Sequence, residues 1–231
     1  MSDLLTPRRR RGVELLDDPS VPPEVMTRSM RDVERANRIF GGTRAALAEL
    51  GPSLAGFSGT ATMLDVGTGA GDIAEAARAS AARHRVSVKT IGFDNSKTLL
   101  SRHRARNDCV VVGNALQLPF ADRSVDIVMC SQLLHHFPEH QALLLIREMN
   151  RVARVRVVIS DLRRSWVAAG GLWLASFVLG FHSVSRHDGV VSVMRGFLPR
   201  ELAALVLSAT GEPSVAQRRL GFRVTTSWKP R

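Results

Sequence analysis

The stretch LDVGTGAGD, residues 64–72, decides the fold of this 231-residue chain. It ends an apolar run, ATMLDV (61–66), that is typical of a buried strand, and an alanine-rich helix is predicted from about 72 to 83. Between them, Gly67, Gly69 and Gly71 permit a tight turn and let a ligand approach the backbone closely. Their G-x-G-x-G spacing differs from the G-x-G-x-x-G of a pyrophosphate site, and no P-loop G-K-[ST] follows. The turn therefore favours a ligand without phosphates.

Apolar strands alternate with helices on the carboxyl side of this turn. Strands are predicted at 86–93, 109–112, 124–130 and 155–160, with helices near 96–106 and 138–152. A helix at 199–209 and one or two last strands within 214–228 follow. Continuous apolar strands separated by helices indicate an α/β fold, with a mostly parallel, doubly wound sheet covered on both faces.

The segment before the first strand is predicted to consist of a tail and two helices. Residues 1–23 are rich in Arg and Pro and are expected to be mobile. Apolar residues recur at helical spacing over 24–40, and a second helix is predicted from Thr43 to Leu50, ended by Gly51-Pro52. We expect residues 24–58 to act as a lid on the α/β domain, which spans 59–231.

An uncharged stretch, Ser165–Ser185, lies inside that domain. Twenty-one residues can span a bilayer, but Gly170, Gly171, Gly180 and His182 interrupt the stretch, which also lies between segments of one sheet. We therefore expect an apolar helical insertion, residues 165–198. It would roof a cavity or touch a lipophilic substrate or a membrane face.

The composition indicates which partners and which cellular setting to expect. Lys+Arg 32 against Asp+Glu 21 gives a net charge of +11, which first suggests nucleic acid or an anionic surface as partner. Two cysteines, Cys109 and Cys130, cannot form a disulfide framework and are expected to be inert core thiols. No apolar segment follows Arg8–Arg11, so a secretory signal is not indicated, and we expect a reducing, cytoplasmic setting.

Asp94 is the strongest single candidate for binding a nucleoside. It ends the second predicted strand, 23 residues after Gly71, where a carboxylate can accept both hydroxyls of a ribose. Its alternative role is the N-cap of the helix that begins near Ser96.

Together these residues resemble the class I S-adenosylmethionine-dependent methyltransferases, and most closely the type 11 branch that includes quinone and polyketide methyltransferases. LDVGTGAGD resembles the first motif and IGFDNS (91–96) the ribose motif. GNALQLPFADRSVDIVMCSQLLHHF (113–137) resembles a run that ends in a histidine pair, and REMNRVARVRVVISDLRRS (147–165) the helix and strand that follow. The resemblance covers about 59–165 well and 186–228 loosely. It implies a Rossmann-like, seven-stranded sheet and S-adenosylmethionine as cofactor, with no metal ion.

The resemblance also implies where the cofactor binds. Asp65 would orient the glycine turn, Asp94 would hold the ribose hydroxyls, and Asn95 would lie against the adenine. The family usually has Asp at position 114, but the Asn114 carbonyl can still accept from an adenine amino group. The implied cofactor residues are Asp65, Gly67, Thr68, Gly69, Gly71, Asp94, Asn95, Asn114, Ala115 and Ser131.

Methyl transfer needs positioning above all, because a sulfonium methyl is already electrophilic. An oxygen or acidic carbon nucleophile must also lose its proton, and histidine is suited to that task near neutral pH. The candidate bases are His135, His136 and His187; the pair at 135–136 has an alternative structural role beside the helix at Pro138, and His187 one in a polar loop. The candidate substrate residues are Asp161, Arg163, Trp173, Phe177 and His182, with a surface salt bridge as the alternative for the first two.

Three functions remain open at this point. The first is a methyltransferase for the O or C nucleophile of a small lipophilic acceptor, such as a phenol, quinol or polyketide. The second is an RNA methyltransferase, suggested by the +11 charge but disfavoured because SQLLHH replaces the N-P-P-Y-like motif of base-amine methylation. The third is a methyltransferase-like partner subunit without catalysis.

Overall fold

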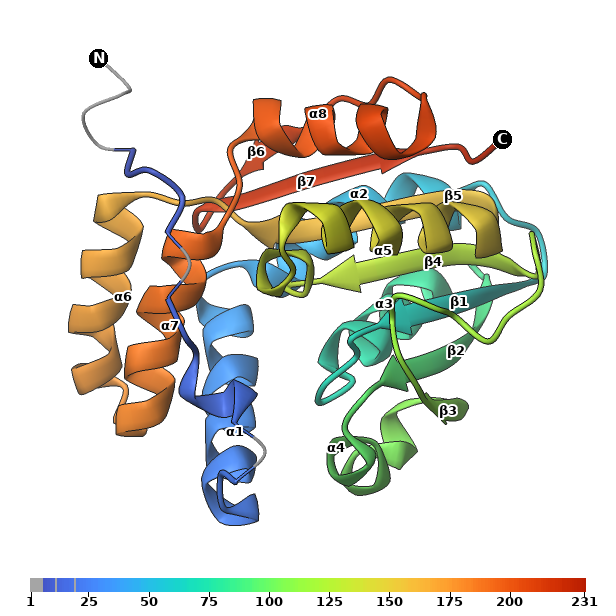
Figure 1. Ribbon diagram of the computed structural model, residues 1–231. Helices are drawn as coiled ribbons and strands as arrows, with labels where there is room; N and C mark the ends of the chain where they lie inside the picture. Colours follow the sequence, from blue (N-terminus) through green and yellow to red (C-terminus); the bar gives the residue numbers. More distant parts are fainter. Residues whose placement is uncertain (1–5, 11, 19) are drawn as a thin grey trace.

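The computed structural model describes residues 6–10, 12–18 and 20–231 (Figure 1). The mobility predicted for 1–23 concerns in part residues 1–5, 11 and 19, which lie outside the described residues. The rest of that segment contains a short 3-10 helix, η1 (Leu15–Asp17), which contacts the helix α7 (Ser183–Arg195). This segment, Thr6–Asp18 without Arg11, is called the N-terminal strap below.

The described residues form one seven-stranded sheet in the order β3-β2-β1-β4-β5-β7-β6. The first five strands in the chain are parallel, whereas β7 pairs antiparallel with β5 and β6 pairs antiparallel with β7. This is the Rossmann-like, mostly parallel sheet that the sequence predicts. The strands are β1 (Thr60–Val66), β2 (Ser87–Asp94), β3 (Cys109–Val112), β4 (Val125–Ser131), β5 (Ala153–Leu162), β6 (Gln217–Arg219) and β7 (Arg223–Trp228).

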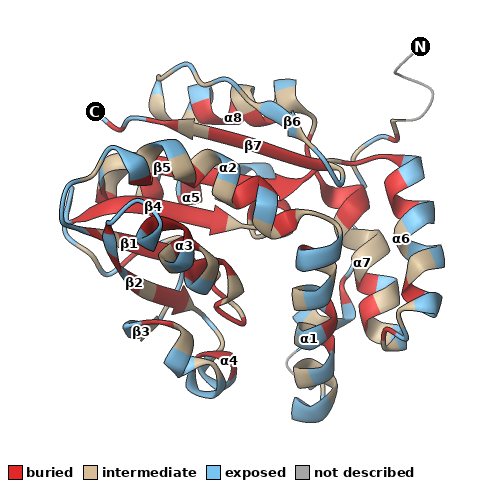
Figure 2. Cartoon of the chain, turned by 180° about the vertical axis from the view of Figure 1, so that it is seen from behind, coloured by how far each residue is buried: buried red, intermediate tan, exposed pale blue. Residues whose placement is uncertain are grey.

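Helices cover both faces of the sheet because successive side chains of each strand point to opposite sides. On β4, Ile127 and Met129 pack with α2 (Gly42–Ala55) and α3 (Asp72–Ala82). Val128 and Cys130 pack with α5 (Glu139–Val152) and α8 (Pro199–Thr210) on the other face. Short helices α4 (Lys97–Arg102) and η2 (Arg104–Arg106) lie between β2 and β3. Figure 2 shows the central strands buried and the outer sides of these helices exposed.

A second group of helices lies beyond the carboxyl ends of the parallel strands (Figure 1). It consists of α1 (Pro23–Ile39), α6 (Trp166–Val178) and α7, and we call it, together with the N-terminal strap, the cap. Helices α6 and α7 form the insertion predicted over 165–198, and Ala168 and Ala169 of α6 pack against Val193 and Met194 of α7. No helix formed by the described residues is both long and apolar enough to cross a lipid bilayer.

Two local predictions are wrong. Helix α2 does not end at Gly51-Pro52 but continues to Ala55, because Leu54 is fully buried against the sheet and that burial holds the last turn despite the missing proline N–H. Cys109 is not a core thiol: it is exposed, because β3 is an edge strand, whereas Cys130 on the central strand β4 is buried.

Candidate active site

A cleft of about 1200 Å³ separates the carboxyl ends of β1, β2 and β4 from the cap. That volume exceeds the roughly 300–1000 Å³ of a pocket for one small ligand, so the cleft has room for a cofactor and an acceptor. Carboxyl ends of parallel strands at a change of strand order are the usual ligand site of such sheets, and β1 lies between β2 and β4 at this change. Predicted site residues that line it are Asp65, Gly67, Thr68, Gly69, Asp94, Asn95, Ser131, His135 and His136.

The glycine turn presents its backbone to this cleft. Gly67 has φ +72°, and a Cβ there would lie 2.8 Å from the Leu133 side chain, so a larger residue would have to displace it. Gly69 has φ +52°, and a Cβ there would meet open space. The amides of Gly67 and Thr68 donate to the Phe93 carbonyl at 2.7 and 3.1 Å, which ties the turn to the end of β2. The turn is thus held open toward a ligand.

Asp65, on β1 just before the glycine turn, has a buried carboxyl group. One oxygen accepts a hydrogen bond from Thr68 Oγ1 at 2.9 Å, while no described residue bonds the other, Oδ1. Burial raises the pKa of Asp65 to about 7; the Thr68 hydrogen bond opposes that shift, and the charges of Asp72 and Asp94 add to it. Ser131 Oγ is likewise buried without a partner among the described residues. Buried polar atoms of this kind are normally bonded, so both fit a polar ligand such as the implied cofactor.

Asp94 stands at the mouth of the glycine turn, as the ribose prediction requires. Its Oδ2 accepts from the Gly69 amide at 3.0 Å and its Oδ1 from the Ser96 amide at 2.9 Å. The N-cap of α4 is Ser96, whose Oγ accepts from the Leu99 amide at 3.3 Å. A carboxylate has about four acceptor sites, so Asp94 keeps capacity for two ribose hydroxyls.

Three residues implied as cofactor contacts do not line the cleft. Asn114 is exposed, and its side-chain oxygen accepts from the Leu116 amide, so it stabilises its own turn. Ala115 packs against the core beside α5. Gly71 is the left-handed residue that starts α3, with φ +74°, and shapes the turn rather than facing the ligand. Their places in the fold follow from local turn geometry that one-dimensional spacing does not resolve.

His135 and Asp161 form a buried pair at the carboxyl ends of β4 and β5. Asp161 Oδ1 accepts from His135 Nδ1 at 2.7 Å, and its two oxygens also accept from the backbone amides of Leu162 and His135. Burial opposes the charge of Asp161, but the charge and hydrogen bond of His135 outweigh it and lower the pKa of Asp161. Because Nδ1 keeps its hydrogen toward this carboxylate, the deprotonated form of the ring has its lone pair on Nε2. No described residue bonds that atom.

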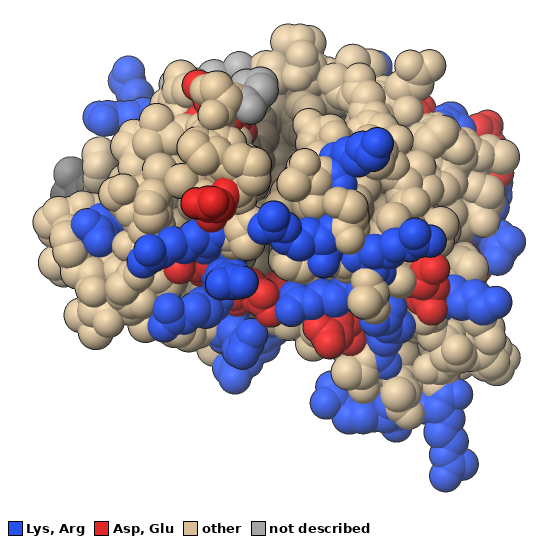
Figure 3. All heavy atoms as spheres, turned by 90° about the horizontal axis from the view of Figure 1, so that it is seen from below, with Lys and Arg blue, Asp and Glu red and all other residues tan. Residues whose placement is uncertain are grey.

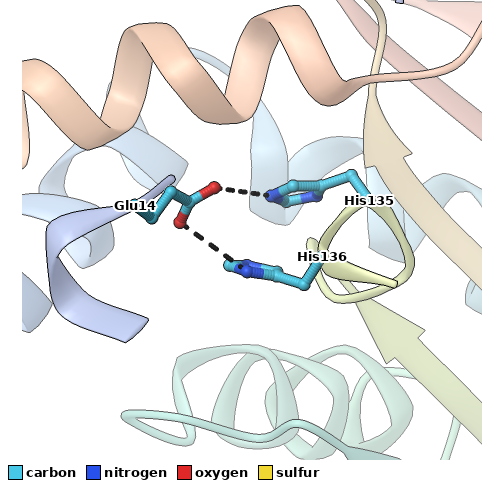
Figure 4. Close-up of side chains that lie close together, drawn as sticks. All are labelled: Glu14, His135 and His136. Atoms are coloured by element: carbon cyan, nitrogen blue, oxygen red, sulfur yellow. Dashed lines mark ion pairs between the residues drawn. The ribbon is translucent and has the colours of Figure 1, made fainter. Parts of the chain in front are cut away.

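His136 stacks on His135, with ring centroids 4.3 Å apart, and faces the N-terminal strap. Its Nδ1 lies 3.5 Å from Asp17 Oδ1 and 3.7 Å from Glu14 Oε2. Burial would lower the pKa of His136, but the hydrogen bond to Asp17 and the charges of Glu14 and Asp17 reverse this and raise it. Figure 4 shows Glu14 reaching both rings, with its other oxygen 3.8 Å from His135 Nε2.

Glu14 and Arg195 are the residues that the sequence reasoning missed. Glu14 is buried, and its Oε1 accepts from Arg195 Nη1 at 2.9 Å and from Ser192 Oγ at 2.8 Å. The Leu15 and Leu16 amides donate to Asp188 at 2.8 and 2.9 Å. These contacts hold the strap across the cleft. An acid in an Arg-rich segment carries no local signal that it pairs with a residue 181 positions away.

The same three side chains could in geometric terms hold a metal ion. One ligand atom each of Glu14, His135 and His136 lies within 4.8 Å of the others. However, the Arg195 guanidinium already donates to Glu14, and its Nη1 is 3.4 Å from His136 Nδ1. A fixed positive charge at this distance repels a second cation, so the cluster is better suited to acid–base chemistry.

The remaining candidates lie away from the cleft wall. His187 is half exposed and its Nδ1 donates to Oδ1 of its neighbour Asp188 at 2.8 Å, while His182 caps α7 by accepting from the Val184 amide at 3.3 Å. Arg163 lies over the Phe222 ring at 4.9 Å. Trp173 and Phe177 are exposed on the outer side of α6, where their rings contact edge to face. The helical phase of α6, which only packing on α7 fixes, turns both rings outward.

Comparison with known proteins supports the same fold. Residues 64–159 match the family described as "Methyltransferase domain". An uncharacterized methyltransferase of Schizosaccharomyces pombe is 33% identical over 95 residues, which span 41% of this chain and only 36% of that relative. Human N-acetylserotonin methyltransferase has a TM-score of 0.63 at 14% identity, covering 97% of this chain and 63% of the other.

Two bacterial structures agree. A SAM-dependent methyltransferase from Aquifex aeolicus has a TM-score of 0.60 at 15% identity and covers 92% of this chain and 100% of the other. Magnesium protoporphyrin IX methyltransferase from Synechocystis, solved with bound SAH, has a TM-score of 0.58 at 13% identity, covering 86% and 87%. At such identities these likenesses establish the fold.

Proposed function

We propose that this chain, a class I S-adenosylmethionine-dependent methyltransferase by its family and fold, transfers a methyl group to an oxygen or acidic carbon of a small lipophilic acceptor. The observation that carries the proposal is the His135–Asp161 pair at the cleft. A buried imidazole with an oriented tautomer, whose Nε2 has no hydrogen-bond partner among the described residues, is suited to take a proton from a nucleophile.

Each part of the cleft has a distinct task in this proposal. The sulfonium of S-adenosylmethionine, when bound, supplies an electrophilic methyl group. Asp94 and the glycine turn hold the nucleoside, and Asp65 and Ser131 offer their free polar atoms to it. His135 Nε2 accepts the proton as the acceptor attacks, and Asp161 stabilises the imidazolium that results. The cap excludes water, which strengthens this electrostatic stabilisation.

The cap side of the cleft explains why the acceptor is expected to be lipophilic. Side chains from α1, the end of β5 and the insertion line it, and most are aliphatic, thioether or aromatic. Such a wall gains from burying apolar ligand surface. Phenols, quinols and polyketides combine this apolar character with an ionisable oxygen or carbon. The apolar cap residues at the cleft include Met26, Met30, Val33, Phe40, Val167, Leu172, Phe181 and Val193.

Two measurements test the function. Titration calorimetry of the purified protein should show that S-adenosylhomocysteine binds, and mass spectrometry of reactions with a panel of phenols, quinols and polyketides should find an acceptor gaining 14 Da, about the mass of one CH₂. Binding of S-adenosylhomocysteine without methylation of any small acceptor, combined with methyl incorporation into RNA, would contradict the acceptor class. Absence of cofactor binding would contradict the enzymatic role and favour a partner subunit.

A further inference from the structure

The outer side of α6 exposes several large apolar side chains. Its large exposed side chains recur at helical spacing and therefore share one face of the helix. Leu174 is 62% exposed and Val178 is 89% exposed, and Figure 2 shows this side of α6 facing outward. The six residues of this face, called the α6 face below, are Trp166, Val167, Trp173, Leu174, Phe177 and Val178.

The opposite side of α6 contacts α7 and the cleft. Ala168 and Ala169 pack on α7, and Ala168, Gly171 and Leu172 line the cleft. Packing and the active site therefore account for the inner residues but not for two tryptophans, a phenylalanine and a leucine exposed together. Contiguous exposed apolar surface on a protein of this size marks an interaction site.

Arginines border the α6 face at both of its ends. Arg10 lies over the Trp166 ring at 5.3 Å, and Arg186 lies over the Phe177 ring at 3.6 Å. At the carboxyl end, Arg35 Nη1 donates to the Leu179 carbonyl at 3.0 Å. Aromatic rings covered by guanidinium groups combine an apolar surface with positive charge in one place.

More positive charge lies on α1 and α4, beside the carboxyl end of α6. Next to Gly180, which ends the α6 segment, a shallow hollow is lined by four arginines and only two acids, Glu24 and Asp32. Figure 3 shows lysine and arginine side chains gathered in a band across this face of the molecule. The arginines of the hollow are Arg28, Arg31, Arg35 and Arg102.

We propose that the α6 face and these arginines dock the protein on the surface of an anionic lipid bilayer, with α6 lying in the interface. Exposed tryptophan, phenylalanine and leucine enter the boundary between headgroups and acyl chains, and the arginines bind lipid phosphates. A nucleic acid would explain the arginines but not the aliphatic Leu174 and Val178, which make no use of phosphate or base edges.

Docking in this orientation places the wall of the cleft next to the membrane. Val167 belongs to the α6 face and also lines the cleft, and Leu172 lies on the inner side of the same helix. A lipophilic acceptor dissolved in the bilayer could then enter along α6 without crossing water. This consequence rests on the proposed function, whereas docking itself does not.

Vesicle flotation tests the docking. The full chain should float with vesicles of phosphatidylcholine and phosphatidylglycerol at least about fivefold more than with phosphatidylcholine alone, and less in high salt. The double substitution Leu174→Glu and Val178→Glu should reduce binding at least about tenfold, since it puts two carboxylates into the interface. The matched control, Leu207→Glu with Val215→Glu, changes two exposed apolar residues of the same types elsewhere and should leave binding unchanged.

A second pair of variants tests the charge. Arg28→Gln with Arg31→Gln should weaken binding to the anionic vesicles several-fold, whereas Arg83→Gln with Arg123→Gln, two exposed arginines at the other end of the sheet, should not. The proposal is overturned if the full chain binds neither kind of vesicle. It is also overturned if the α6 variant and its control lose vesicle binding to the same extent. Binding to an RNA oligonucleotide that depends on Arg28 and Arg31 but not on Leu174 overturns it in favour of nucleic acid. S-adenosylhomocysteine binding, measured on every variant, verifies folding and separates a failure of docking from a failure of the proposed function.

Discussion

The two walls of the cleft differ in how they are built. The cofactor wall consists of the ends of β1, β2 and β4 with the glycine turn, and its contacts join residues within the turn, such as Thr68 with Asp65, or the turn with the next strand, such as Gly69 with Asp94. The cap wall consists of the N-terminal strap, α1, α6 and α7, and its contacts join distant segments, such as Glu14 with Arg195. The first wall is fixed by local geometry and the second by tertiary packing. The difference implies that the acceptor side can be altered independently of the cofactor side.

The largest effect is expected where the two walls meet. His135→Ala removes the proposed proton acceptor and should lower kcat by about 10²–10⁴-fold while leaving S-adenosylhomocysteine affinity unchanged. Asp161→Asn should also lower kcat, because the amide no longer fixes the tautomer of His135. His187→Ala is the matched control and should keep full turnover, as it lies away from the cleft. Equal turnover in all three variants would contradict the role of His135.

A stability measurement tests the cofactor wall alone. The folded-state pKa of Asp65, about 7, is above its ordinary value of 3.8, so its contribution to stability is full below about pH 4 and is lost as the pH rises through 7. Asp65→Asn removes that pH dependence. In the absence of ligand, the advantage of the variant over the wild type in free energy of unfolding should grow by roughly 3 kcal/mol from pH 5 to pH 8. Denaturant titration at both pH values measures the difference in free energy of unfolding between the variant and the wild type. If this difference is the same at both pH values, Asp65 is not the titrating group.

Asp94→Ala should weaken binding of S-adenosylhomocysteine by about 10–100-fold through the loss of charge-assisted hydrogen bonds to the ribose. Calorimetry gives the affinity. Asp122→Ala, which removes an exposed carboxylate paired with Arg151, serves as control and should bind normally. If Asp94→Ala kept the wild-type affinity for S-adenosylhomocysteine, the nucleoside would not bind at the end of β2.

A smaller effect should separate the cap wall from the cofactor wall. Glu14→Gln keeps the shape of the side chain but weakens its bond to Arg195, so the strap should loosen. We expect the KM for the acceptor to rise about tenfold, or about 1.4 kcal/mol, with no change in S-adenosylhomocysteine affinity. Glu24→Gln, an exposed acid on α1, should change neither. A loss of cofactor affinity in Glu14→Gln would show that the two walls are not independent.

Removal or addition of metal ions is expected to have no effect. Because Arg195 already donates to Glu14, dialysis against a chelator should leave turnover unchanged, and added Zn²⁺ should not raise the melting temperature. Loss of turnover on chelation, restored by the metal, would instead assign Glu14, His135 and His136 as ligands.

Much of the cofactor wall could be predicted from the sequence. The order of strands and helices, the glycine turn at 67–71 and the position of Asp94 at the end of β2 all follow from patterns of two to five residues. The sequence does not show that Asn114 lies outside the cleft lining, because the turn after β3 directs its side chain to its own backbone through the bond to the Leu116 amide. The tertiary structure alone distinguishes His135, which faces Asp161, from His187, which does not reach the cleft.

The sequence by itself determined the parallel α/β sheet, the open glycine turn and the apolar character of residues 165–185. Those features depend on local backbone geometry and on the period of apolar side chains, both of which are written in short stretches of chain. Only the tertiary structure decided which side of α6 faces the cleft, that Trp173 and Phe177 face outward, and that Glu14 reaches the two histidines. The physical reason is that helical phase and long-range ion pairs are set by what packs against each segment, and a sequence pattern does not name that partner.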